Sequence, residues 1–94
     1  MADKVCLFSV GTLVSTPGAL LALMEADVTP LSLVMRHVRG DFGDLCDEDR
    51  AANHAAVVDG TRVFSSYVVA PDTKVWVITE ADRSVTTLLL PSEY

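Results

Sequence analysis

Basic side chains are scarce in this sequence. Its 94 residues include seven Lys and Arg against 13 Asp and Glu, which gives a formal net charge of −6 at pH 7. A surface that binds nucleic acid needs clustered Lys and Arg to displace the counterions around the phosphates. The charge balance therefore argues against direct contact with nucleic acid.

Cysteines are also few, and long apolar runs are missing. Cys6 and Cys46 stand far apart and form no CxxC motif, which is typical of free thiols in a reduced compartment. The longest apolar run, residues 19–24, is much shorter than the roughly 18–20 residues of a membrane span. The first residues lack the basic leader and the cleavage site of a signal peptide. We expect a cytoplasmic protein that does not contact a membrane.

Apolar residues, by contrast, are plentiful. Half of the chain is hydrophobic, so a disordered chain is excluded. No linker, repeat or low-complexity segment divides it, and its length suits one hydrophobic core. We therefore expect a single domain over residues 1–94.

Local patterns predict a strand and two helices in the first 40 residues. Residues 4–10 alternate loosely and favour β structure, so we expect a short, largely buried strand there. Residues 17–27 and 30–39 each follow a threonine that can cap a helix and begin with a proline suited to the first turn. Apolar residues recur in both at helical spacing, and Gly40 stops the second helix.

A third helix and three strands follow. The body of the helix is expected over residues 50–59, with Asp44 or Asp47 as its cap, Glu48 and Asp49 in its first turn and Gly60 as its C-terminal stop. The connections between the last strands are too short for the crossover that parallel pairing needs. The order β-α-α-α-β-β-β predicts an α+β domain with an antiparallel sheet and the helices packed on one face. The last three strands are expected over residues 61–70, 74–79 and 84–90.

Five of the 13 acidic residues gather within ten positions, between Gly40 and Arg50. Carboxylates suit Mg²⁺ or Ca²⁺, but this spacing does not fit an EF-hand loop. The plain interpretation is helix capping and a solvated acidic face, and the functional one is a docking surface for a protein. The five residues are Asp41, Asp44, Asp47, Glu48 and Asp49.

His37 stands near the end of the second helix, shortly before Asp41 and Asp44. A histidine–carboxylate pair can act as a general base, and it can equally tie the loop to the helix. No ligands are paired closely enough for zinc, and Cys46 lacks the electropositive surroundings of a reactive thiol. The residues favour a protein that is not an enzyme and holds no metal or cofactor. A small metal-dependent enzyme centred on His37, Asp41 and Asp44 is the alternative.

Arginines flank the acidic segment. Arg36 and Arg39 precede it, and Arg50 ends it. The plain interpretation is that internal ion pairs pin the loop. The functional interpretation is an arginine-rich contact surface for a partner.

Two aromatic residues indicate a second apolar surface. Phe64 and Tyr67 are three positions apart in an expected strand, so they face opposite sides of the sheet. The helices can cover one side only. The other suits a homodimer interface or a groove for a partner.

Four stretches of the sequence resemble a known family. They read RHVRGDFGDL at residues 36–45, EDRAAN at 48–53, GTRVFSSY at 60–67 and VWVITEADRSVTTLLLPSEY at 75–94. On these motifs the chain resembles small proteins of bacterial plasmids and integrated mobile elements, which are often labelled plasmid-related proteins. The resemblance implies a mobile-element setting, in which small acidic proteins often inhibit host defences, as antirestriction and anti-CRISPR proteins do.

We therefore expect a small acidic interaction protein that inhibits a host defence nuclease complex by protein–protein binding. In this hypothesis its acidic segment meets a basic surface on the partner, where complementary potential speeds encounter more than it adds affinity. A structural homodimer is a further alternative. The expected partner-binding residues are Asp41, Asp44, Asp47, Glu48, Asp49, Arg36 and Arg39.

Overall fold

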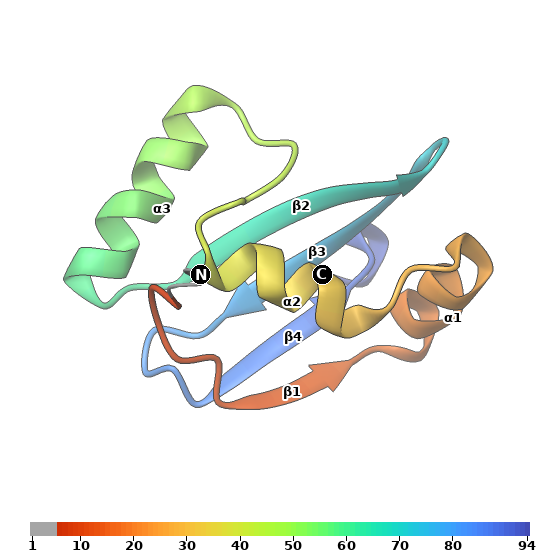
Figure 1. Ribbon diagram of the computed structural model, residues 1–94, viewed down its shortest axis with the longest axis horizontal. Coiled ribbons are helices and arrows are strands. Elements are labelled where there is room, and N and C mark those ends of the chain that lie inside the picture. Colours follow the sequence, from red (N-terminus) through yellow and green to blue (C-terminus); the bar gives the residue numbers. More distant parts are fainter. Residues whose placement is uncertain (1–5) are drawn as a thin grey trace, which may run out of the picture.

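The computed structural model describes residues 6–94, which form three helices, a four-stranded sheet and a short 3₁₀ turn (Figure 1). The α+β fold and the order β-α-α-α-β-β-β are confirmed. The elements are β1 (Thr12–Ser15), α1 (Pro17–Ala26), α2 (Pro30–Val38), α3 (Asp47–Asp59), β2 (Val63–Ala70), β3 (Thr73–Thr79), β4 (Val85–Leu89) and η1 (Pro91–Glu93).

The first two helices start as the threonine–proline pairs predict. The Thr16 hydroxyl accepts a hydrogen bond from the Ala19 N–H (3.1 Å), and the Thr29 hydroxyl accepts one from the Ser32 N–H (3.2 Å). Each following proline takes a first-turn position, where its missing N–H costs nothing. Asp27 follows the last residue of α1, and its left-handed backbone (φ 58°) turns the Val28 N–H back to the Leu23 carbonyl (2.9 Å).

α3 begins at Asp47, carries Glu48 and Asp49 in its first turn as expected, and has no side-chain cap. Cys46 takes the cap position and makes no capping hydrogen bond, so the prediction that Asp44 or Asp47 caps this helix is wrong. The Asp44 carboxylate instead faces Lys74 (3.3 Å). Asp47 lies within the first turn with two other carboxylates, at the positive end of the helix dipole.

The sheet has the strand order β1-β4-β3-β2 and is mixed rather than purely antiparallel. β2, β3 and β4 pair antiparallel in succession, as their short connections predict. β1 instead runs parallel to β4, with Thr12 opposite Val85 and Ser15 opposite Leu88. Three helices and two strands lie between β1 and β4, which is more chain than a parallel crossover needs. The antiparallel prediction is wrong for the first strand alone.

The first strand also lies later in the chain than expected. The prediction covers residues 4–10, of which the first two lie outside the described residues and the rest form no strand. The Leu7 N–H donates to the Val38 carbonyl (2.7 Å), which ties this segment to the end of α2. At Gly11 the backbone is left-handed (φ 64°), and an added Cβ would overlap the Ser84 carbonyl. The chain therefore turns at this glycine before β1 begins.

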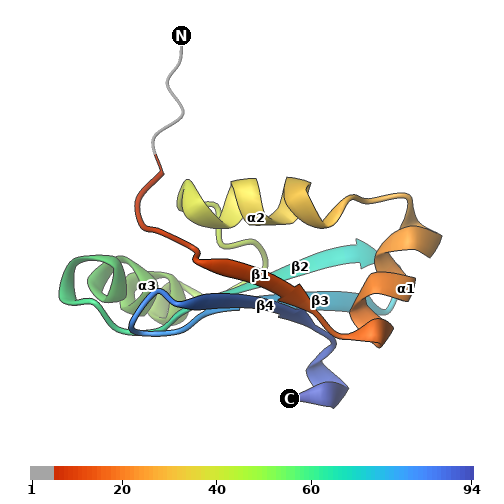
Figure 2. The same cartoon turned by 90° about the horizontal axis from the view of Figure 1, so that it is seen from below.

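α1 and α2 cover one face of the sheet, whereas α3 lies beside its β2 edge. In Figure 2, α2 runs above the sheet and α3 lies level with it at one end. The prediction that the helices share one face is therefore correct for the first two only. The core between these helices and the sheet contains Ala19, Leu23, Leu33, Val34, Val38, Tyr67, Val75, Val77 and Leu88.

The other side of the sheet, here called the open face, is covered by no α-helix of residues 6–94. Phe64 lies on this side and Tyr67 lies in the core, so the prediction that they face opposite sides is confirmed. The turn η1 lies below the sheet in Figure 2 and brings Tyr94 beside Trp76. The side chains of the open face include Val14, Phe64, Val68, Trp76 and Ile78.

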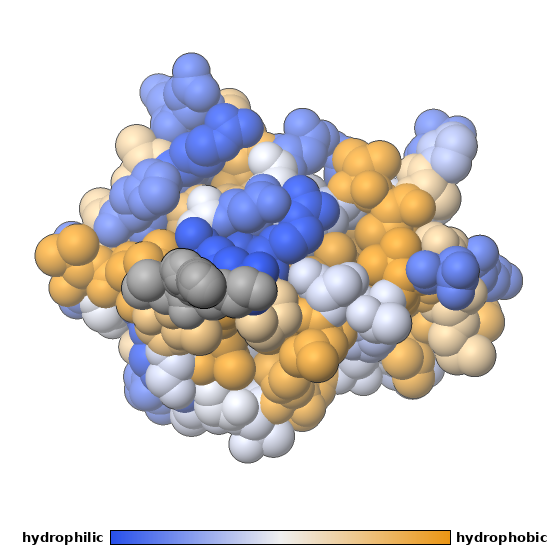
Figure 3. All heavy atoms as spheres, viewed as in Figure 1, coloured by the Kyte–Doolittle hydropathy of each residue, from blue (hydrophilic) through white to orange (hydrophobic). Residues whose placement is uncertain are grey.

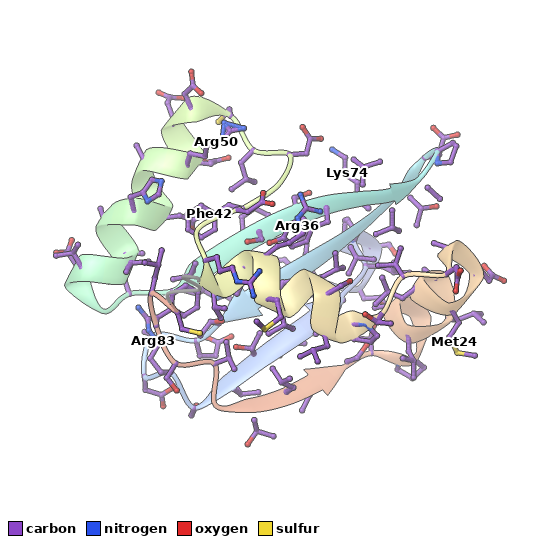
Figure 4. The ribbon with its side chains drawn as sticks, in the orientation of Figure 1. Met24, Arg36, Phe42, Arg50, Lys74 and Arg83 are labelled. Carbon is purple, nitrogen blue, oxygen red and sulfur yellow. The ribbon has the colours of Figure 1, made fainter. Side chains whose placement is uncertain are left out.

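α1 is apolar on more than its core side. Leu20, Leu21 and Met24 are exposed, and Met24 points away from the body of the molecule in Figure 4. In the described part of the chain no single helix is both long and apolar enough to cross a bilayer. α1 and α2 together have that length and composition, but the chain bends by 100° between them.

Candidate functional site

The segment from Gly40 to Arg50, here called the acidic elbow, is tied to α2 by an ion pair. Arg36 donates from Nε to Asp41 Oδ2 (2.7 Å) and from Nη2 to Oδ1 (3.3 Å). The Gly43 N–H donates to the same carboxylate (3.3 Å). The hydrogen bond from Arg36 is the main cause that holds the pKa of Asp41 below its ordinary value, and it raises the pKa of Arg36 in return. The Asp41 carboxylate is therefore charged and already occupied.

Tyr67 supports this ion pair from the core. The Arg36 guanidinium stacks over its ring at 4.5 Å from the centroid, and its hydroxyl donates to the Asp41 carbonyl (2.6 Å). The ring is buried, and this burial raises the pKa of Tyr67 to about 12. Arg36 and Asp41 thus act as a structural tie, as the plain interpretation of the arginines predicts.

Two more carboxylates of the acidic elbow face cations of the chain itself. Asp44 Oδ2 lies 3.3 Å from Lys74 Nζ, and Asp47 Oδ1 lies 3.6 Å from Arg50 Nη1. Figure 4 shows Arg50 and Lys74 on either side of the loop that joins α2 to α3. Both pairs are exposed, so each adds little stability, but each lowers the local negative potential.

Glu48, Asp49 and Arg39 make no ion pair with any other residue of the described chain. The two carboxylates lie in the first turn of α3 and are exposed. Binding of a partner by the acidic elbow stays a prediction. The acidic surface that is free of internal cations is much narrower than the sequence suggests, because three of its five carboxylates are paired.

His37 is fully buried, and it hydrogen-bonds neither Asp41 nor Asp44. Its Nδ1 lies 2.6 Å from Ser65 Oγ, and its Nε2 lies 2.9 Å from Thr79 Oγ1. The carboxylates of Asp41 and Asp44 face Arg36 and a lysine instead. The three residues of the alternative enzyme site are therefore not assembled around a common point.

The position of the proton on His37 follows from the hydrogen-bond chain that runs through Thr79 and Thr86 to the Val10 carbonyl. The Val10 carbonyl only accepts, so the Thr86 hydroxyl donates to it (2.8 Å) and accepts from the Thr79 hydroxyl (2.6 Å). Thr79 has then used its proton and accepts from His37 Nε2. His37 therefore carries its proton on Nε2, and its Nδ1 accepts from the Ser65 hydroxyl.

A neutral imidazole fits these surroundings. Burial, and to a smaller extent the charge of Arg83, lowers the pKa of His37 to about 4. Phe8 and Phe42 pack edge-on against the ring, with centroid distances of 5.1 and 6.3 Å. The histidine is a core residue whose two ring nitrogens both have hydrogen-bond partners. Among residues 6–94, no three His, Cys, Asp or Glu side chains lie close enough together to hold a metal ion.

A cluster on the open face is a stronger candidate, and the sequence pattern pointed to only one of its residues, Phe64. Trp76 packs edge-on against Phe64 and Tyr94, with centroid distances of 5.0 and 5.6 Å. The Arg62 guanidinium lies over the Tyr94 ring at 5.5 Å and donates to its hydroxyl (2.8 Å). Together with Ile78, these side chains line a hollow of about 240 Å³, here called the aromatic pocket.

The rim of the aromatic pocket is accessible and carries charge. Tyr94 is 67% exposed, and Arg62 Nη2 lies 3.6 Å from Glu80 Oε2. The hydrogen bond to Tyr94 is the main cause that raises the pKa of Arg62. The strand pattern around Phe64 was the available signal for this site, since it placed an aromatic ring on the uncovered side. No local spacing links Tyr94 to Arg62, because η1 brings them together.

Comparisons with protein-family models, curated proteins and solved structures found no match to this chain. The geometry of the acidic elbow and of the aromatic pocket is therefore the basis for a proposed function.

Proposed function

We propose that this chain is a non-enzymatic interaction protein that binds a partner protein through the aromatic pocket on its open face. The observation that carries the proposal is the grouping of Trp76, Tyr94 and Arg62 on a sheet surface that no α-helix of the described chain covers. These three residue types are the ones most enriched among the residues that dominate binding energy at protein interfaces.

The size and lining of the pocket support a protein partner rather than a small ligand. Its volume of about 240 Å³ lies below the range of roughly 300–1,000 Å³ that is typical of small-molecule sites. Such a hollow accepts one side chain from a partner. The Arg62 guanidinium already has Tyr94 and Glu80 as partners, so the incoming group is expected to be apolar or aromatic.

The resemblance to mobile-element proteins supports the biological setting of the proposal. In this setting the partner is a host defence nuclease complex, and the protein acts as an inhibitor of antirestriction or anti-CRISPR type. The acidic elbow has a secondary part in the proposal. Glu48 and Asp49, which pair with no cation of residues 6–94, raise the rate of encounter with a basic partner more than they raise its affinity.

The test is retention of a nuclease complex from a host lysate on immobilised protein, followed by an assay of the retained nuclease. Trp76→Ala is the test variant. Val68→Ala is the matched control, because Val68 is 57% exposed on the same face but lies outside the aromatic pocket. We expect the wild type and the control to retain and inhibit the complex, and Trp76→Ala to lose both. Equal retention by all three forms would contradict binding through the pocket, and a retained but fully active nuclease would contradict inhibition.

A further inference from the structure

The two edge strands of the sheet differ in whether other parts of the chain hydrogen-bond to their outer backbone groups. At the β2 edge, the Asn53 amide accepts from the Phe64 N–H (3.1 Å) and donates to its carbonyl, so one side chain imitates a neighbouring strand. Beside it, the Ser66 N–H donates to the Phe42 carbonyl (3.1 Å), and the Ser66 carbonyl accepts from the Asp44 N–H (2.6 Å). The middle of this edge is therefore unavailable to another strand.

Nothing within residues 6–94 covers the β1 edge in this way. The N–H groups of Thr12 and Thr16 point inward, to the Ser84 and Leu88 carbonyls of the β4 side (both 3.0 Å). By the alternation of a strand, the backbone groups of Leu13 and Ser15 point outward, and no backbone partner within residues 6–94 meets them there. All four residues of β1 are exposed. Figure 1 shows β1 along the lower edge of the molecule, with no helix or loop beyond it.

The composition of β1 offers none of the usual defences of an exposed edge. Monomeric proteins place Lys, Pro, a bulge or an inward-pointing charge on such strands to prevent pairing with another chain. The strand Thr12–Ser15 reads TLVS, and both of its aliphatic side chains are more than two-fifths exposed: Leu13 at 45% and Val14 at 42%. The outer backbone groups of β1 can therefore pair with another strand, because no charge or proline of β1 prevents it.

The charge distribution indicates that a second copy of this chain can receive it. Two copies, each with a net charge of −6, repel one another except where their surfaces are uncharged. Residues 6–24 contain no Asp, Glu, Lys or Arg, and β1 lies in the middle of this segment. Hydrophilic side chains gather over α3 in Figure 3, whereas white and orange side chains predominate along the lower rim, over β1.

We propose that the protein forms a homodimer in which β1 pairs antiparallel with β1 of a second copy, about a two-fold axis through Val14. In this register Leu13 exchanges both backbone hydrogen bonds with Ser15 of the partner subunit, and Ser15 does the same with the partner subunit's Leu13. Val14 faces Val14 of the partner subunit across a pair without hydrogen bonds. The register uses only residues of β1, since Gly11 turns the chain away on one side and Pro17 begins a helix on the other.

The dimer would join two four-stranded sheets into one continuous sheet of eight strands. Its two-fold axis stands perpendicular to the sheet, because paired residues of neighbouring strands lie on the same side. Both open faces would then lie on one side of the assembly. This proposal does not depend on the proposed function, since the β1 edge and the aromatic pocket are different surfaces.

Disulfide trapping tests the register, and light scattering tests the oligomeric state. Both free cysteines are exposed, so Cys6→Ser and Cys46→Ser provide the background. We expect Val14→Cys to form an inter-subunit disulfide on mild oxidation, since Cα atoms in a pair without hydrogen bonds are about 4.5 Å apart. Leu13→Cys is the matched control. Its nearest equivalent in the partner lies diagonally, at more than about 7 Å, and should not cross-link.

The wild type should scatter as a dimer, and Val14→Lys should scatter as a monomer with an unchanged circular dichroism spectrum, because it places two like charges in contact. A wild type that stays monomeric into the millimolar range overturns the proposal. So does a dimer that survives Val14→Lys, or cross-linking of Leu13→Cys in preference to Val14→Cys. A monomer that binds a strand of a different protein at β1 would also contradict the proposal, because the second strand would then not come from another copy of this chain.

Discussion

The acidic elbow and the aromatic pocket use their polar and aromatic groups in opposite ways. In the elbow, Asp41 is bound by Arg36, and two other carboxylates face cations of the same chain. In the pocket, Trp76 is half-buried and packs on Tyr94, which is exposed. A dense cluster of charge in a sequence can therefore stabilise the fold through internal ion pairs, while a smaller aromatic cluster stays accessible to a partner.

Loss of the Phe42 ring should have the largest effect on stability. Phe42 is 1% exposed and anchors the acidic elbow between α3 and β2, so Phe42→Ala is expected to lower the free energy of unfolding by about 3–5 kcal/mol. Tyr94→Ala, at the pocket rim, should lower it by only about 1 kcal/mol, since it loses one exposed aromatic contact. Urea denaturation of both variants checks the contrast. Similar losses at the two sites would mean that the pocket is as structural as the elbow.

Acid should weaken the fold through His37. The unfolded histidine takes up its proton near pH 6.5, whereas burial delays protonation in the fold to about pH 4. Between these values the unfolded state binds more protons, so stability is complete above pH 6.5 and falls by about 3 kcal/mol as the pH drops to about 4. Asp41, whose pKa is lowered, acts only below its ordinary value of 3.8 and thus outside this window.

Denaturation at several pH values measures the loss of stability between pH 6.5 and about 4. His37→Gln should remove most of this pH dependence. The NMR chemical shifts of the imidazole nitrogens in the wild type are an independent test. They should show a neutral ring with its proton on Nε2 at pH 7. A His37 that titrates near 6.5 in the folded protein would refute the buried, neutral ring.

Replacement of the guanidinium in the acidic elbow should have a moderate effect. Arg36→Lys keeps the charge but loses the two-pronged contact to Asp41 and the planar stack on Tyr67. Because both charged side chains are about half exposed, we expect a loss of about 1 kcal/mol in thermal unfolding. Arg39→Lys is the control, and it should be neutral. A loss of equal size in both would leave the Arg36–Asp41 tie without support.

Charge reversal of the two free carboxylates should have the smallest effect. Glu48→Lys together with Asp49→Lys is expected to slow association with a basic partner by less than about tenfold and to leave the dissociation rate unchanged. Surface plasmon resonance at two salt concentrations separates these rates. A large rise in the dissociation rate would show that the elbow itself forms the centre of the interface.

Local signals in the sequence were enough for the helices and for three of the strands. Thr16 and Thr29 each cap a helix within three residues, and such contacts can be read from spacing alone. The first strand was misplaced because a hydrogen bond to the end of α2 and the turn at Gly11 override the β pattern of residues 4–10. Its parallel pairing depends on a crossover through most of the chain, which no short window contains.

The candidate site was harder to predict because its contacts are distant in sequence. Lys74 neutralises Asp44 from a strand 30 positions away, and no motif links the two. The aromatic pocket needs Tyr94 to fold back over Trp76. The sequence did predict that Phe64 lies on the side opposite Tyr67, which was the one available sign of the open face.

The most direct test of the account is to compare which surface a partner recognises. The measurement is the affinity of the retained nuclease complex for Trp76→Ala and for the Glu48→Lys/Asp49→Lys double variant, each relative to wild type. We expect Trp76→Ala to weaken binding by about thirtyfold or more, as the loss of about 2 kcal/mol at a central aromatic residue implies, and the double variant to weaken it by less than tenfold. Strong loss in the double variant with full binding by Trp76→Ala would contradict the account and return the binding surface to the acidic elbow.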